Sequence, residues 1–284
     1  MAHPDVLIVD DDDATRDGLR ALLTNASLQV DAAADGAQAL EKINTHDFGV
    51  VLLDVQLPGI GGLDLLARCV AKETPPKVIV MTGVDTTETA LSALRGQAYD
   101  FVSKPIEPSR LVEMVRRALA TGPDVTRIEV LSARPEWVEL LVPCTKECAD
   151  RIQSFVRQLE ADLPNDVRES VGLAFRELLL NGIEWGGRFN PAQRVRVACL
   201  RARRMLLYRI ADPGPGFTFD ELSHASINAT DVMAHDLVRQ EKGIRPGGFG
   251  LVLIRAIADE LIYNERQNEV LFVKYLDEPA AQPS

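Results

Sequence analysis

The stretch VLIVDDDD, residues 6 to 13, joins four apolar residues to four consecutive aspartates. Further apolar runs, VVLLD at 50–54, KVIVM at 77–81 and YDFVS at 99–103, are separated from it and from each other by helix-like segments. Short buried strands that alternate with amphipathic helices are typical of a parallel sheet with helices on both faces. Residues 6 to about 120 are therefore predicted to form a doubly wound α/β sheet.

Acidic residues follow two strands of this predicted sheet. The first strand leads into Asp10 and Asp11, and the third ends in Asp54. Ligands of such sheets bind outside the carboxyl ends of the strands, so these carboxylates are expected to meet at one edge. Mg²⁺ prefers hard oxygen ligands, and the backbone carbonyl of Gln56 would add one more. The aspartate run alone is also typical of a solvated charged segment, but the joint pattern favours a metal site.

Two further strand ends suit phosphoryl chemistry at the same edge. A carboxylate can attack a phosphoryl group when a metal ion and a cation offset the charge, and Lys104 follows the YDFVS strand. Thr82 ends the VIVMT strand and offers a hydroxyl to a phosphate. The pattern predicts an aspartate that accepts phosphate.

Residues 4 to 121 resemble the receiver domain of bacterial response regulators. The matching motifs are VDD at 9–11, LLDVQLPGIGG at 52–62, MTG at 81–83 and SKP at 103–105. The resemblance implies a five-stranded, flavodoxin-like sheet and a cis peptide between Lys104 and Pro105. It also implies that an upstream histidine kinase or phosphotransfer protein phosphorylates Asp54. The resemblance further implies that Asp10, Asp11, Asp54 and the Gln56 carbonyl bind Mg²⁺, and that Thr82 and Lys104 contact the phosphate. Phe101 takes the position of the family's aromatic switch residue, and ordinary core packing is the alternative for it.

The second half of the chain carries three segments that suit a nucleotide. In FRELLLN, Glu177 and Asn181 are four residues apart and share one helix face. In IADPGPGF, Asp212 can accept an exocyclic amine, while Gly214 and Gly216 let a flat base approach the backbone. GGFGL at 247–251 opens a predicted helix whose free amides can bind phosphates. Each segment alone is weak, and their order and spacing carry the prediction.

Together these segments resemble the N box and glycine boxes of the GHKL ATPases, over residues 126 to 276. The likeness is greatest to the anti-sigma-factor serine kinases, because a strand and a single helix lead straight into the ELLLN helix. The resemblance implies an α/β sandwich of the Bergerat type that binds ATP and Mg²⁺. Its implied site residues are Glu177 as general base, Asn181 as Mg²⁺ ligand, Asp212 as adenine reader, and Gly214, Gly216, Gly247, Gly248 and Gly250 around the nucleotide.

Two residues beside the predicted ATP site need separate interpretation, because one departs from the family pattern and the other has two possible roles. Trp185 stands where the family often has histidine, which bears on the lid and on the phosphate contacts. Glu184 lies near the face of Asn181 and is either a second metal ligand or a solvated acid at the helix end. The histidines, His3, His46, His224 and His235, all lie outside residues 122–165, so a phosphorylatable dimerisation hairpin has no place there.

The composition of the chain argues against a membrane protein, a nucleic acid-binding protein and a zinc-binding protein. No apolar run approaches the roughly 20 residues of a membrane span, so a cytoplasmic protein without a membrane segment is expected. The net charge of −11 argues against direct nucleic acid binding. The four cysteines lack zinc-site spacing. The predicted organisation is a receiver domain at 1–121, a linker at 122–125, the ATPase domain at 126–276 with a lid at 217–246, and a disordered tail at 277–284.

These observations lead to one leading hypothesis and two alternatives. The leading one is a homodimeric response regulator in which phosphorylation of Asp54 controls an anti-sigma-type serine/threonine kinase. Its partner would be a STAS anti-anti-sigma protein, a sigma factor or both. In the first alternative the second domain holds ATP without transferring phosphate and the receiver gates partner binding. In the other, the ATPase domain phosphorylates a histidine on a separate protein.

Overall fold

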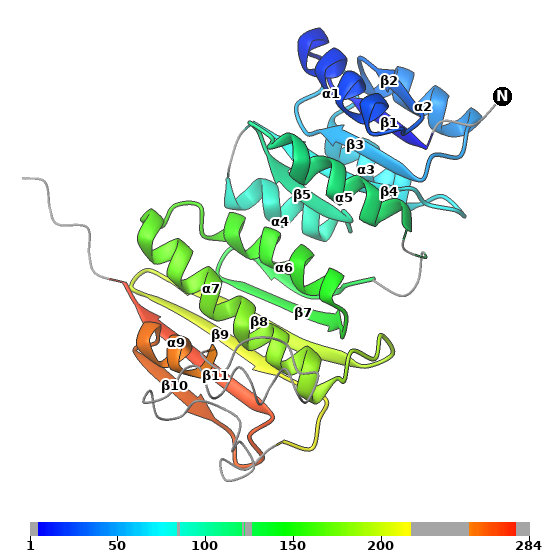
Figure 1. Cartoon of the computed structure of the whole chain (residues 1–284). Coiled ribbons are helices and arrows are strands. Elements are labelled where there is room, and N and C mark those ends of the chain that lie inside the picture. The colour runs from blue at the N-terminus through cyan, green and yellow to red at the C-terminus, as the bar shows by residue number, and fades with distance from the viewer. Residues whose placement is uncertain (1–4, 84–85, 121, 123–126, 217–249, 277–284) are drawn as a thin grey trace, which may run out of the picture. The chain divides into compact units, whose positions relative to one another are not determined.

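The structure, a computed structural model, describes residues 5–83, 86–120, 122, 127–216 and 250–276 of the 284-residue chain. Contacts divide the chain into two compact units (Figure 1). The first comprises Met1–Arg127 with Ser154–Ala161, and the second comprises Ile128–Gln153 with Asp162–Ser284. Several predicted features lie outside the described residues, namely most of the linker, the lid, the tail, Gly247, Gly248, His3, His224 and His235.

The first unit contains five strands that alternate with five helices among its residues up to Ala120. In chain order they are β1 (Val6–Val9), α1 (Asp13–Asn25), β2 (Val30–Ala33), α2 (Gly36–Thr45), β3 (Val50–Asp54), α3 (Gly62–Val70), β4 (Lys77–Thr82), α4 (Thr87–Arg95), β5 (Asp100–Ser103) and α5 (Pro108–Ala120). The strands pair in parallel in the order β2-β1-β3-β4-β5. The predicted doubly wound, five-stranded parallel sheet is confirmed.

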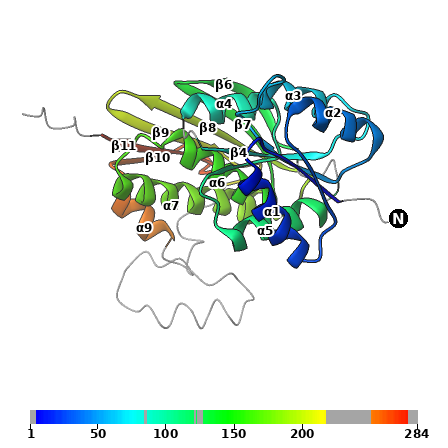
Figure 2. The same ribbon diagram turned by 90° about the horizontal axis from the view of Figure 1, so that it is seen from above.

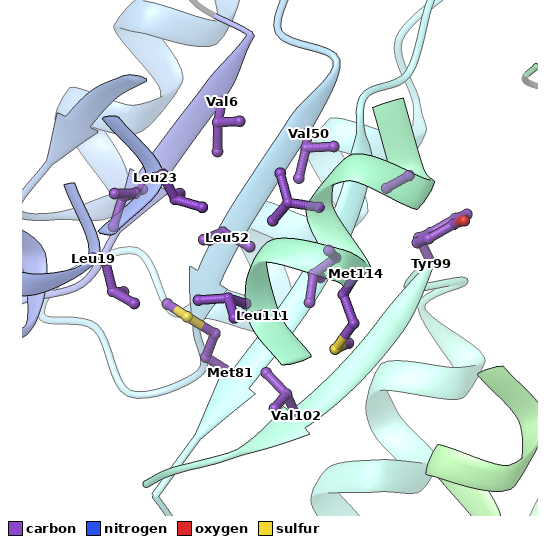
Figure 3. Close-up of a cluster of buried hydrophobic side chains, with 14 residues drawn as sticks. Val6, Leu19, Leu23, Val50, Leu52, Met81, Tyr99, Val102, Leu111 and Met114 are labelled. Atoms are coloured by element: carbon purple, nitrogen blue, oxygen red, sulfur yellow. The ribbon is translucent and has the colours of Figure 1, made fainter. Parts of the chain in front are cut away.

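Burial on both sides explains why the central strands of this sheet are apolar throughout. Every residue of β1 and β3 is buried. Alternate side chains of these strands pack against α1 and α5 on one face (Figure 3). The residues of that core drawn and labelled are Val6, Leu19, Leu23, Val50, Leu52, Met81, Tyr99, Val102, Leu111 and Met114. The helices therefore hold the strand ends, and the side chains that follow them, in fixed positions.

The second unit is built on a six-stranded antiparallel sheet. The elements from residue 128 on are β6 (Glu129–Arg134), β7 (Trp137–Pro143), α6 (Lys146–Leu159, of which the residues from Ser154 on are grouped with the first unit), α7 (Asn165–Asn181), the π-helix η1 (Gly182–Gly186), β8 (Arg194–Ala202), β9 (Met205–Ala211), α9 (Gly250–Ile257), β10 (Glu260–Tyr263) and β11 (Glu269–Tyr275). The strand order is β10-β11-β9-β8-β7-β6. Helices α7 and α9 lie on one face of this sheet (Figure 2). The predicted α/β sandwich is confirmed.

Aromatic packing fixes α7 on the sheet. Tyr208 of β9 lies between Phe175 of α7 and Phe272 of β11, with ring centroids 5.0 and 5.9 Å apart respectively. All three side chains are almost completely buried. Because Phe175 is anchored in this way, Glu177 and Asn181 further along α7 also have fixed positions relative to the sheet.

The helix predicted for residues 165–185 is a regular α-helix only as far as Asn181. Beyond it the chain widens into η1, Gly182–Gly186. A Cβ atom at Gly186 would lie 2.1 Å from Oδ1 of Asp212, so this segment of backbone packs directly against the loop that follows β9. We attribute the wider turn to this close approach, which the residue pattern of α7 does not encode.

Candidate phosphoacceptor and nucleotide sites

The first site lies at the carboxyl ends of β1 and β3. Asp10 and Asp11 follow β1, and Asp54 is the last residue of β3. One carboxylate oxygen from each of the three lies within 4.8 Å of the others. Asp10 is fully buried and Asp54 is 5% exposed. The three predicted carboxylate ligands are therefore brought together, and an all-oxygen set of this kind fits Mg²⁺.

The other two aspartates of the run are engaged elsewhere. Asp12 is the N-cap of α1, where its Oδ2 accepts hydrogen bonds from the backbone N and the hydroxyl of Thr15, at 2.9 and 2.6 Å. These hydrogen bonds lower the pKa of Asp12. Asp13 forms an ion pair with Arg16, and Arg16 also donates to the backbone oxygen of Asp10 at 2.7 Å. The run thus divides into two pocket carboxylates and two that order the start of α1.

Lys104 supplies the cation of this pocket. Its Nζ lies 2.6 Å from Oδ2 of Asp10 and also forms an ion pair with Asp54. Burial by itself would lower the pKa of Lys104, but the hydrogen bonds to Asp10 and Asp54 outweigh burial and raise it. Burial raises the pKa of Asp10, and the hydrogen bond from Lys104 offsets part of that effect. The ammonium group therefore neutralises two crowded carboxylates.

Thr82, Gln56 and Phe101 complete the predicted set. Thr82 ends β4, is buried, and accepts the backbone N–H of Lys104 on its own carbonyl at 2.7 Å. The backbone N of Gln56 donates to Oδ1 of Asp54 at 2.9 Å. Phe101, in β5, is 2% exposed. The peptide between Lys104 and Pro105 is cis, as the resemblance implied.

Two residues that the sequence reasoning missed shape this pocket, Arg16 and Gly62. A Cβ atom at Gly62 would lie 2.2 Å from the backbone oxygen of Asp54, so only glycine lets α3 begin this close to Asp54. The third glycine of LPGIGG, Gly62, was a usable signal for this contact. No comparable signal marked Arg16, because a basic residue one turn into a helix is ordinarily a surface residue.

The second site is formed around α7 of the other unit. Glu177 and Asn181 lie one turn apart and are both partly buried. A Cβ atom at Gly250, the first residue of α9, would lie 2.8 Å from Oε2 of Glu177. The carboxylate of Glu177 therefore faces the start of α9, where the backbone amides of the first turn have no partner within the helix.

Asp212 is enclosed by glycine backbone. Its Oδ1 accepts the backbone N–H of Gly214 at 2.8 Å, and a Cβ atom at Gly214 would lie 2.8 Å from the same oxygen. The loop is held further by Asn268, whose side chain donates to the Gly214 carbonyl at 3.1 Å. Burial raises the pKa of Asp212, and the hydrogen bond from Gly214 offsets part of the effect. A partly buried carboxylate beside Gly186 and Gly214 suits recognition of a planar donor.

The remaining predicted residues of this site divide into described and undescribed ones. Gly216 has φ of +88°, and a Cβ atom there would overlap the Arg266 carbonyl, so glycine is required. Gly247 and Gly248, predicted to bind phosphate, lie outside the described residues. Trp185 is 48% exposed, and Glu184 is partly buried. Sequence reasoning missed Cys144, whose Sγ would lie 2.1 Å from a Cβ atom at Gly187.

The four cysteines, Cys69, Cys144, Cys148 and Cys199, are all free thiols. Burial raises the pKa of the Cys144 thiol to about 11, so it stays protonated at neutral pH. In the part of the chain that the structure covers, no helix is long and apolar enough to cross a membrane.

Comparison with known proteins assigns a different family model to each half of the chain. Residues 6–116 match the family model of the response regulator receiver domain, and residues 142–274 match that of the histidine kinase-like ATPase domain. The transcriptional regulatory protein FixJ of Bradyrhizobium diazoefficiens is 33% identical over 127 residues, covering 45% of this chain and 62% of FixJ. The DNA-binding response regulator MtrA of Mycolicibacterium smegmatis is 33% identical over 203 residues, covering 70% of this chain and 86% of MtrA.

Among solved structures, the receiver domain of NtrX from Brucella abortus is 36% identical, with a TM-score of 0.40. The match covers 42% of this chain and 100% of that structure. The C4-dicarboxylate transport regulator DctD of Pseudomonas aeruginosa is 40% identical over 119 residues, and the match covers only 26% of DctD. The chain thus spans less than two thirds of FixJ and about a quarter of DctD.

Proposed function

Because this chain belongs to the response regulator family and carries a histidine kinase-like ATPase domain behind its receiver domain, we propose that phosphorylation of Asp54 controls an ATP-dependent protein kinase. The kinase is of the anti-sigma type and acts on a serine or threonine of a partner. The domain bounds we propose are 1–121 for the receiver, 122–125 for the linker, 126–276 for the ATPase domain and 277–284 for the tail.

In the receiver, Asp54 attacks the phosphoryl group of an upstream histidine kinase or phosphotransfer protein. A bond forms between an Asp54 carboxylate oxygen and phosphorus, and the bond from phosphorus to the donor nitrogen breaks. Asp10, Asp11, Asp54 and the Gln56 carbonyl would hold Mg²⁺, which would offset the charge of the phosphoryl group. Lys104, which already contacts two carboxylates of the pocket, moves to the new phosphate, and the Thr82 hydroxyl donates a hydrogen bond to it.

In the ATPase domain, Asp212 accepts a hydrogen bond from the exocyclic amine of adenine and Asn181 holds Mg²⁺. Gly214 and Gly216 shape the base pocket, and Gly247, Gly248 and Gly250 contact the phosphates. The hydroxyl oxygen of the partner attacks the γ-phosphorus while Glu177 takes the hydroxyl proton. The bond from the γ-phosphorus to the oxygen that joins it to the β-phosphate breaks, and ADP leaves. The observation that carries this assignment is the approach of Glu177 to Gly250, because it sets a base beside the phosphate-binding start of a helix.

The partner we propose is a STAS anti-anti-sigma protein, a sigma factor or both, bound by a homodimer of this chain. Phosphorylation of Asp54 sets how active the ATPase domain is or how tightly it holds that partner. A tenfold to hundredfold change requires the phosphorylated receiver to favour one state by about 1.4 to 2.8 kcal/mol. The few charge-assisted hydrogen bonds that a new phosphate forms are sufficient for this.

The test is transfer from γ-labelled ATP to candidate STAS and sigma-factor partners, followed by acid and base treatment of the product. Acid-stable label on serine or threonine is the expected result. Glu177→Ala should abolish transfer and leave ATP binding intact, and transfer that persists would disprove the assignment of the base. ATP binding without transfer would instead indicate a non-catalytic partner-binding module, and acid-labile, base-stable label would indicate a histidine acceptor.

A further inference from the structure

Two large aromatic side chains are exposed just beyond the nucleotide site. Trp185, in η1, is 48% exposed and Phe189, four residues later, is 39% exposed. Most large apolar side chains of the described residues are buried, and six are exposed, of which these two lie in one short segment. Neighbouring exposed aromatic residues on a soluble protein commonly mark a binding surface.

The backbone that presents Phe189 is unusual. Arg188 and Phe189 both have φ of +51°, the left-handed region that non-glycine residues avoid. Backbone hydrogen bonds hold the segment in this form, from Gly187 to the Gly182 carbonyl at 2.9 Å and from Phe189 to the Ile183 carbonyl at 3.1 Å. Conformations of this kind persist where the surrounding structure enforces them and cluster at functional sites. Phe189 is therefore held outward in a fixed loop.

Two cations flank these aromatic rings. The Nζ of Lys146, the first residue of α6, lies 5.5 Å from the centroid of the Phe189 ring. Arg188 is exposed beside it. Throughout the described residues, neither cation has a carboxylate within ion-pair distance. Lys146 and Arg188 thus place two positive charges at the Phe189 ring, on a chain whose net charge is −11.

This surface adjoins the predicted phosphate donor. Trp185 directly precedes Gly186, whose backbone packs against Asp212, and follows Asn181 by four residues. Gly187, between Trp185 and Arg188, packs against Cys144. Cys144 lies two residues before Lys146, the first residue of α6. A protein segment bound here would lie next to the ATP site.

We propose that Lys146, Trp185, Arg188 and Phe189, here called the aromatic-basic surface, dock the protein substrate of the kinase. The bound segment carries apolar side chains next to carboxylates. Tryptophan, other aromatic residues and arginine dominate the binding energy of protein interfaces, and unpaired cations select acidic partners. A loop already fixed in its conformation loses little entropy on binding. This inference rests on the proposed kinase function, because it identifies where that kinase holds its substrate.

The test uses the full chain and three fluorescein-labelled peptides of equal length in fluorescence anisotropy. One alternates glutamate with leucine, one alternates lysine with leucine, and one alternates glutamate with serine. The acidic-apolar peptide should bind about tenfold tighter than either of the others, since both the charge and the apolar contacts are required. Equal binding of the three peptides would overturn the proposal.

Phe189→Gly separates docking from a structural role. Glycine removes the ring and also relieves the left-handed backbone, so the Tm should stay the same or rise. Affinity for the acidic-apolar peptide should fall by about tenfold, as expected for loss of an interface aromatic. The matched control is Ile262→Ala, since Ile262 in β10 is 49% exposed and lies outside the surface. A lower Tm with unchanged peptide affinity would show that Phe189 stabilises the fold and does not bind the peptide.

Charge reversal gives an independent readout. The double variant Lys146→Glu with Arg188→Glu should lose the preference for the acidic-apolar peptide and gain one for the basic-apolar peptide. Sedimentation of the same variants tests whether a second copy of this chain occupies the surface, and a changed oligomeric state with unchanged peptide binding would overturn the proposal. Phosphoryl transfer from γ-labelled ATP to the candidate partners is measured separately, so failure of the kinase assignment (no transfer) and failure of the docking surface (no peptide preference) can be told apart.

Discussion

Lys104 and Asp10 form a close ion pair, with 2.6 Å between Nζ and Oδ2, at a position where the carboxylate has no exposed surface. Asp54 shares the same ammonium group. One lysine therefore offsets part of the negative charge of two carboxylates that we propose as Mg²⁺ ligands. If they bind Mg²⁺, the metal and Lys104 offset the same charge, and the stability of the receiver should depend on both.

Lys104→Met should destabilise the receiver most when Mg²⁺ is removed. Without the lysine, Asp10 and Asp54 repel each other in a buried position, and loss of one partner of a largely buried pair costs about 1 to 3 kcal/mol. Calorimetric scans in EDTA should show a clear fall in the receiver Tm, and added Mg²⁺ should restore most of it. An equal fall in the receiver Tm with and without Mg²⁺ would show that Mg²⁺ does not offset the charge of Asp10 and Asp54.

The four aspartates should respond to alanine substitution in two different ways. Asp12→Ala removes the cap of α1 and should lower the receiver Tm by a few degrees while leaving Mg²⁺ affinity unchanged. Asp11→Ala should weaken Mg²⁺ binding without lowering the Tm in EDTA. Isothermal titration with Mg²⁺ and calorimetry on both variants check this division, which fails if Asp12→Ala weakens the metal as much as Asp11→Ala does.

Gly186 and Gly182 offer a matched pair of substitutions within η1. A Cβ atom at Gly186 would lie 2.1 Å from Oδ1 of Asp212, whereas one at Gly182 would lie 3.4 Å from the Cβ atom of Asp212. Gly186→Ala should displace the Asp212 carboxylate and weaken ATP binding by about tenfold or more, as expected for a lost hydrogen bond to a charged group. Gly182→Ala should bind ATP nearly as the unaltered protein does. Similar dissociation constants for the two variants would show that Asp212 does not need this loop.

ATP affinity should depend on pH through Asp212. The pKa of this carboxyl is raised above its ordinary value of 3.8 because the group is buried. A raised pKa in the folded state means that its contribution to stability is present below pH 3.8 and is lost as the pH rises through the raised pKa. Adenine donates to the ionised form, so affinity should fall as the pH is lowered through that same pKa.

Asp212→Asn is the control for that pH dependence. It removes the ionisable group, so the Tm of the nucleotide-free protein at neutral pH should not fall and the pH dependence of ATP affinity should flatten. ATP affinity itself should drop by about tenfold or more, because a neutral amide is a weaker acceptor. If the variant keeps both the affinity and its pH dependence, Asp212 is not the residue that reads adenine.

The central strands and the acidic residues at their ends could be predicted because both are determined by residues adjacent in the sequence. β1 and β3 are buried on both faces and so are apolar throughout, and a parallel sheet brings Asp10 and Asp54 to one edge whatever the helices do. By contrast, β2 has little apolar signal of its own. It is an edge strand of four mostly half-exposed residues, and its Asp31 forms an ion pair with Lys42.

Features set by distant contacts could not be predicted. The π-helix η1 contains Gly186, which packs against Asp212, a residue 26 positions away in the sequence. The left-handed backbone of Phe189 depends on its hydrogen bond to Ile183 within that same wide turn. The roles of Asp12 and Asp13 were likewise not predicted, because they depend on the partners Thr15 and Arg16 that the start of α1 provides.

The most direct test of the account is the rate of transfer from ATP to a STAS partner, measured with and without prior treatment of the chain with acetyl phosphate. The predicted result is acid-stable phosphoserine or phosphothreonine, formed at a rate that changes by about tenfold or more when Asp54 is phosphorylated. Asp54→Asn should remove labelling by acetyl phosphate and fix the transfer rate at one value. A transfer rate in the unaltered protein that does not respond to acetyl phosphate, while Asp54 is labelled, would contradict the claim that the receiver controls the ATPase domain.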